Sequence, residues 1–125
     1  MAKKPKPREH FKDEPEAHDF PAAADFLRLL FSEEEATALV DALRSAPTIR
    51  RKAKDLLRAS GLDLLPREDP EVAKDLKRVA RGEALSPVLL VRAPPLVVAD
   101  GYHRICASYH LDESVEVSCR LVDAP

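Results

Sequence analysis

The sequence has few of the features that mark secreted or membrane proteins. Its 125 residues include only two cysteines, Cys106 and Cys119, and no apolar stretch follows the N-terminal lysines. A disulfide scaffold and a secretory leader are therefore not expected. The longest apolar run, between residues 88 and 98, is interrupted by Arg92 and two prolines and is too short to span a bilayer. We expect a cytoplasmic protein with no membrane partner.

The chain also lacks an excess of charge of either sign. It has 20 Lys and Arg against 22 Asp and Glu, which gives a formal net charge of -2 and a pI of about 6.1. This balance provides no overall attraction to nucleic acid, although a local basic patch is compatible with it. A DNA partner is therefore not favoured. With 45% hydrophobic and 34% charged residues, a chain of this length can bury one modest core.

The first 19 residues are almost entirely polar. They are rich in Lys, Pro, Glu and His, and Phe11 is nearly the only large apolar side chain among them. A segment of this composition cannot bury enough surface to offset the entropy lost on ordering. We therefore predict a flexible arm over residues 1–19 and interpret its basic cluster, residues 3–8, as solvated.

Residues 20–68 are predicted to form a helical extension. Apolar residues at helical spacing and an early proline predict a helix over residues 20–31. Ser32 and Glu35 have the spacing of a capping box, in which each side chain satisfies a backbone amide of the other residue. This pair predicts the start of a second helix, which Pro47 ends.

A third helix is predicted over residues 48–60 of this extension. Arginine and lysine side chains surround a set of apolar residues there, and Gly61 is suited to cap the end of the helix. Basic residues on an amphipathic helix usually form its solvated face. The face from Arg50 to Lys54 is nevertheless a candidate for auxiliary contact with phosphate.

Residues 69–125 are predicted to form the core of the fold. Asp69 and Pro70 have the residue types of an N-cap and a first helical position, and the helix they begin extends to about Arg81. The pattern then predicts a strand over 87–92, a proline-containing turn, a strand over 96–99, a helix over 102–109 and a strand over 115–122. The predicted fold class is α+β, a small mixed sheet with packed helices and the N-terminal helical extension.

The most informative motif is the segment Asp100-Gly101-Tyr102-His103-Arg104. It joins an apolar strand to a helix, and the first amides of a helix favour an anion. Glycine permits a backbone conformation that is closed to other residues, and Arg104 and His103 can both donate to phosphate oxygens. Tyr102 is a candidate to stack on a base. These five residues form the predicted ligand site, whose catalytic candidates are Asp100 and His103.

The order of these elements and this motif resemble the ParB/sulfiredoxin superfamily over residues 69–122. In that superfamily a turn of the form Asp/Gly-Gly-x-His/Arg-Arg binds nucleotide or phosphate. The matching positions here are Asp100, Gly101, His103 and Arg104. The resemblance implies a ParB/sulfiredoxin-like fold and binding of a nucleotide or another phosphorylated ligand at this turn.

The chain departs from the characterised members in ways that narrow the implied chemistry. Sulfiredoxins have their reactive cysteine directly before the His-Arg pair, where this chain has Tyr102, so sulfinic acid reduction is not expected. ParB proteins continue into a helix-turn-helix and a dimerisation region that this sequence does not contain, so centromere binding is not expected either. Free serine kinases place a catalytic glutamate in an N-terminal segment. Glu68 and Glu71 are candidates for that role.

A zinc site is an alternative interpretation of the same region. His103, Cys106 and His110 share one face of the predicted helix, and Cys119 on the next strand is a fourth candidate ligand. Against this interpretation, a cysteine at the position of Cys106 behaves as a small buried apolar residue, and the spacing matches no common zinc motif.

The function predicted from the sequence is binding of a nucleotide or other phosphorylated small molecule, with phosphoryl-transfer or nuclease chemistry as a hypothesis. Mg²⁺ is expected to arrive with the phosphates, because no dedicated set of carboxylates is visible. The second hypothesis is a non-enzymatic regulatory or DNA-associated module that senses a nucleotide. A protein partner or a homo-oligomer is compatible with either.

Overall fold

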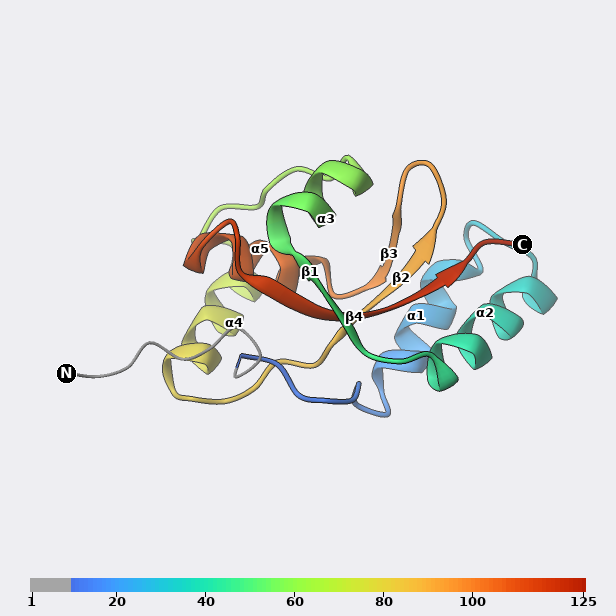
Figure 1. Cartoon of the computed structure of the whole chain (residues 1–125), viewed down its shortest axis with the longest axis horizontal. Helices are drawn as coiled ribbons and strands as arrows, with labels where there is room; N and C mark the ends of the chain where they lie inside the picture. The colour runs from blue at the N-terminus through green and yellow to red at the C-terminus, as the bar shows by residue number, and fades with distance from the viewer. Residues whose placement is uncertain (1–9) are drawn as a thin grey trace.

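The computed structural model describes residues 10–125, and it is an α+β fold, as expected from the sequence (Figure 1). The elements in chain order are α1 (Asp19–Leu27), α2 (Glu33–Ser45), β1 (Ile49–Lys52), α3 (Ala53–Ser60), α4 (Pro70–Ala80), β2 (Val88–Arg92), β3 (Val97–Asp100), α5 (Tyr102–Leu111) and β4 (Glu116–Asp123). The basic cluster predicted at residues 3–8 lies outside the described residues.

The four strands form one mixed sheet in the order β1-β4-β2-β3. β4 pairs antiparallel with β1 and parallel with β2, and β2 pairs antiparallel with β3. The predicted hairpin of two apolar strands is therefore confirmed. Because β1 and β3 occupy opposite edges of the sheet, the residues at their ends belong to separate regions of the surface.

Helices cover both faces of the sheet and create two apolar layers. Figure 1 shows α1 and α2 grouped to one side of the sheet, and α3, α4 and α5 to the other. In β2, Val88 and Leu90 pack with α3–α5, whereas Leu89 and Val91 pack with α1 and α2. Side chains alternate between the faces of a strand, so a strand covered on both sides needs an unbroken apolar run.

Local signals in the sequence correctly predicted several helix ends. The Ser32 hydroxyl accepts from the Glu35 amide and the Glu35 carboxylate accepts from the Ser32 amide, both at 3.1 Å. Asp69 accepts from the first-turn amides of α4, which has Pro70 at its first position. Gly61 ends α3 in a left-handed conformation with φ of 70°.

The helix predicted over residues 48–60 is wrong in its first half. Residues Ile49–Lys52 form the edge strand β1, and only Ala53–Ser60 are helical. The reason is pairing with β4, where Ile49 lies opposite Cys119. The partner strand β4 is distant in the sequence, and pairing with it outweighs the helical preference of the local residues. β1 thereby places a segment of the predicted helical extension in the central sheet.

The flexible arm predicted for residues 1–19 does not extend over residues 10–19. Phe11 is only 4% exposed and forms an isolated bridge with Leu85, where backbone bonds join Lys12 and His10 to the same residue. A single apolar side chain therefore anchors a segment that is otherwise polar. The burial of one aromatic ring stabilises by about 1.5–3 kcal/mol, which offsets part of the entropy lost on ordering.

Candidate functional site

The predicted motif lies at the edge of the sheet, where β3 ends and α5 begins. Gly101 joins the two elements with φ of 110°, a backbone conformation that favours glycine. A Cβ atom at this position would lie 2.4 Å from Val88 Cγ1 and 2.8 Å from Arg104 Nη2. A glycine is therefore required at position 101, because α5 starts directly against β2. The atoms that a Cβ would meet belong to Val88 and Arg104 of the protein itself.

A cleft of about 180 Å³ opens beside this junction. Its lining comes from α4 and from the β3–α5 junction, and consists of Glu71, Asp75, Arg78, Asp100, Gly101, His103 and Arg104. The structure thus brings four of the five predicted ligand residues to one cleft. The first intrahelical bond of α5 runs from Ile105 to the Gly101 carbonyl, and Gly101 has no side chain to cap the amides before it. Uncapped first-turn amides favour an anion.

Arg104 is bound mainly to carboxylates of the protein itself. Its Nη2 donates to Asp100 Oδ2 at 2.7 Å, and its Nη1 lies 3.6 Å from Asp19 Oδ1. The side chain is 15% exposed, and its Nε is buried without a hydrogen-bond partner among the described residues. The sequence predicts that the Arg104 guanidinium binds phosphate directly. In the structure this guanidinium is already paired with the carboxylates of Asp100 and Asp19.

Asp19 is the buried centre of this ion-pair network. It accepts from the Glu16 amide at 3.1 Å and from the Ser86 hydroxyl, and it lies beside Arg104. The network joins the start of α1 to the β3–α5 junction. Nothing in the local sequence distinguishes Asp19 from an ordinary acid in the first turn of a helix, so this network could not be predicted from the sequence.

His103 is the exposed member of the motif. Its side chain is 45% exposed, and its Nε2 lies 4.0 Å from Asp69 Oδ2, the atom that caps α4. Tyr102 lies next to it, with ring centroids 5.6 Å apart, and the Tyr102 hydroxyl donates to the Asp63 carbonyl. Tyr102 therefore holds the loop before α4 against α5, while His103 remains accessible from the cleft.

Helix α4 supplies three cleft residues, of which the sequence analysis named only Glu71. Glu71, Asp75 and Arg78 lie at spacings of four and three, which place them on one face of the helix. That spacing is the signal that could have identified them. The Arg78 guanidinium lies 3.9 Å from Asp75 and is 47% exposed, so it is available to a ligand. Glu68 does not line the cleft.

Two of the cleft carboxyls are harder to ionise than usual. Burial raises the pKa of Asp75, against the opposing attraction of Arg104 and Arg78. Burial also raises the pKa of Asp100, although Arg104 lies beside it, and the neighbouring Asp19 adds to that increase. Raised pKa values in a cleft are typical of functional sites, though ion-pair networks produce them as well.

The zinc alternative is wrong for the described residues, among which no group of three or more His, Cys, Asp and Glu side chains can hold a metal ion. Cys106 and Cys119 are fully buried in the apolar layer, and His110 Nε2 lies 2.7 Å from the Leu65 carbonyl. Burial raises the pKa of Cys106 and raises that of Cys119 to about 11. Both thiols are therefore in their unreactive, protonated form at neutral pH.

The basic residues 50–54 do not assist this cleft. Arg50 and Arg51 belong to β1, at the opposite edge of the sheet from β3. Arg50 instead lies 3.6 Å from Glu116 on the neighbouring strand. The prediction of an auxiliary phosphate contact was wrong because it assumed one helical face, whereas a strand distributes these side chains between two faces.

Comparison of this chain with models of protein families, with curated protein sequences and with solved structures finds no match. Among residues 10–125, no helix is both long and apolar enough to cross a membrane.

Proposed function

We propose that the cleft between α4 and the start of α5 binds the phosphate groups of a nucleotide or another phosphorylated small molecule. The observation that carries the proposal is the convergence of Arg78, His103 and the uncapped amides of α5 on one open cleft. Helix amino termini bind phosphate through their free amides and the helix dipole, and arginine and histidine add charge-assisted hydrogen bonds. The resemblance to the ParB/sulfiredoxin motif supports the same assignment.

The acids of the cleft are compatible with an anionic ligand. Asp100 is neutralised by Arg104, and burial raises the pKa of Asp75, which makes it easier to protonate when a phosphate approaches. Glu71 lies at the exposed start of α4. Arg78 and His103 lie on the two walls of the cleft and provide the direct contacts, while Arg104 positions the turn.

The described residues do not form a magnesium site of their own. Asp100 is engaged by Arg104, and no group of three potential ligands is present among residues 10–125. A nucleotide can instead carry Mg²⁺ on its phosphates, since protein sites often supply only one or two carboxylates to this ion. The proposal therefore concerns phosphate and does not depend on a resident metal.

Calorimetric titration with ATP, CTP and inorganic phosphate, each with and without Mg²⁺, tests the proposal. Arg78→Gln and His103→Gln should each weaken binding by at least about tenfold, because a hydrogen bond to a charged group contributes about 1.5–3 kcal/mol. Neither substitution disturbs the buried Asp19 network. Arg81→Gln is the matched control, since Arg81 is exposed at the end of α4 and does not line the cleft.

The absence of binding for every phosphate compound, or equal binding by all three variants, would contradict the proposal. Incubation of bound nucleotide with small hydroxyl compounds or with DNA then separates two possibilities. Release of a nucleoside diphosphate or cleavage of DNA indicates an enzyme, whereas unchanged nucleotide indicates a sensor module.

A further inference from the structure

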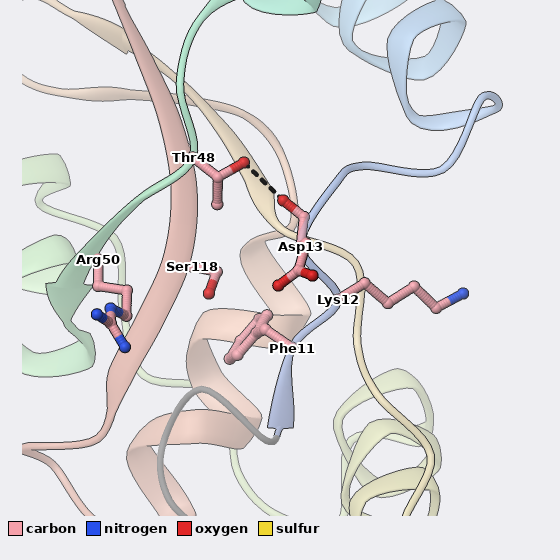
Figure 2. Close-up of a pocket in the computed structure, with 6 residues that line it drawn as sticks. All are labelled: Phe11, Lys12, Asp13, Thr48, Arg50 and Ser118. Carbon is pink, nitrogen blue, oxygen red and sulfur yellow. Dashed lines mark hydrogen bonds between the residues drawn. The ribbon is translucent and has the colours of Figure 1, made fainter.

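A second hollow lies at the opposite edge of the sheet, between β1, β4 and the segment before α1. It has a volume of about 370 Å³, within the range of small-ligand sites. Figure 2 shows its lining residues, which are Phe11, Lys12, Asp13, Thr48, Arg50 and Ser118. None of these residues belongs to the phosphate cleft described above.

The walls of this pocket are held in place by pairing and hydrogen bonds. Arg50 lies directly opposite Ser118 in the antiparallel β1–β4 pair, so the two side chains share one face of the sheet. The Thr48 hydroxyl donates to the Asp13 carbonyl at 2.8 Å, which fastens the N-terminal segment to the strand (Figure 2). The buried ring of Phe11 anchors the same segment from below.

Opposite charges face this pocket from its two walls. In Figure 2 the Arg50 guanidinium and the Asp13 carboxylate lie on either side of the Ser118 hydroxyl, whereas Lys12 extends away from them. Arg50 is only loosely engaged, at 3.6 Å from Glu116 and 49% exposed. Within residues 10–125, the Asp13 carboxylate has neither an ion pair nor a hydrogen bond. Both charged groups are thus available to a ligand.

A buried arginine adds positive potential behind the Thr48 side of the pocket. Arg120 is 8% exposed, and its guanidinium donates to the Thr48 hydroxyl and to the Leu43 and Arg44 carbonyls. These acceptors are neutral, and no carboxylate of the described chain lies at ion-pair distance from Arg120. A buried charge without an ionic partner favours an anionic group nearby, and the Asp13 carboxylate on the Thr48 side of the pocket is such a group.

We propose that this pocket binds a small zwitterion whose ammonium and carboxylate groups are separated by a short carbon chain. The carboxylate pairs with Arg50, and the ammonium pairs with Asp13 on the other wall. Ser118 offers a hydroxyl between them, and the edge of Phe11 provides an apolar contact for the chain. A ligand with a single charge can pair with Arg50 or with Asp13 but not with both. The pocket should therefore prefer a molecule that has both charges.

Titration of the ¹⁵N-labelled protein with 4-aminobutyrate and 6-aminohexanoate tests this inference. Butyrate and butylamine are the matched probes, because each has only one of the two charges. The zwitterions should shift the amides of residues 11–13, 48–50 and 118, and each singly charged probe should bind about fivefold more weakly or not at all. Equal shifts with butyrate or butylamine would overturn the proposal.

Substitutions in the pocket provide the second arm of the test. Asp13→Asn and Arg50→Gln should each weaken binding of the zwitterion about fivefold. The double variant should bind the zwitterion no more tightly than either single variant binds butyrate or butylamine. Both side chains are exposed, so the variants are expected to fold, which an unchanged melting temperature verifies. Asp41→Asn and Arg58→Gln are exposed controls outside the pocket. Binding that persists in both pocket variants would refute the assignment.

Discussion

Replacement of Gly101 by alanine tests the geometry on which the candidate phosphate site depends. Its φ of 110° costs an alanine about 1–3 kcal/mol as backbone strain. The added Cβ also falls 2.4 Å from Val88 Cγ1 and 2.7 Å from Val88 Cβ, and overpacking of this kind costs about 1–3 kcal/mol. The expected loss in free energy of unfolding is therefore about 2–6 kcal/mol, out of a typical total of about 5–15 kcal/mol.

Urea denaturation followed by circular dichroism measures this loss, and the other two glycines provide the controls. Gly61 and Gly82 also have positive φ, of 70° and 80°, but a Cβ at either position meets nothing within 4 Å. Gly82→Ala should therefore cost only about 1–2 kcal/mol for the left-handed backbone. Val88→Ala should reduce the cost of Gly101→Ala only in part, because it removes Val88 Cγ1 but leaves Val88 Cβ, which lies 2.7 Å from the added atom. A cost for Gly101→Ala no greater than that for Gly82→Ala would refute the argument.

Three further predictions follow from the buried groups. Asp19→Asn should lower the free energy of unfolding by about 3 kcal/mol, because it removes the buried carboxylate that pairs with the partly buried Arg104. The exposed Asp25→Asn should cost less than about 1 kcal/mol, and equal losses in thermal melts would count against the network. The pKa of Asp75 is raised in the folded state, so its contribution to stability is present at acid pH and lost as the pH rises through that value. Asp75→Asn should therefore gain stability relative to wild type as the pH rises above about 4, the usual pKa of an aspartate. A difference in stability between the two proteins that does not change with pH would contradict this expectation. Cys106 and Cys119 should react with a thiol reagent only on unfolding, and rapid labelling of the native protein at neutral pH would contradict their burial.

Features set by neighbouring residues could be predicted from the sequence. The capping box of Ser32 and the Asp69–Pro70 helix start depend on bonds within a few residues, so the sequence pattern alone specifies them. The β2–β3 hairpin has apolar strands on both sides of a short turn and is similarly local. The α+β class followed from these elements together.

Features that depend on distant partners could not be predicted in this way. β1 is a strand because β4 pairs with it, and Phe11 is buried because Leu85 lies beside it. The ion pair between Asp19 and Arg104 likewise joins two ends of the chain. The sequence pattern places Arg104 correctly at the start of a helix and allows Asp100 as its partner, but it does not identify Asp19. Arg78 and His103 line the cleft with their paired carboxylates 3.9 Å and 4.0 Å away, and they are the direct ligand contacts in the proposed function.

The proposed function requires that phosphate binds at the amino terminus of α5. The most direct measurement is an amide shift titration of the ¹⁵N-labelled protein with MgATP and with inorganic phosphate. We expect the largest shifts at residues 101–104 and at Arg78, and we expect Arg78→Gln combined with His103→Gln to remove them. Shifts confined to other parts of the chain, or shifts unchanged in that double variant, would contradict it.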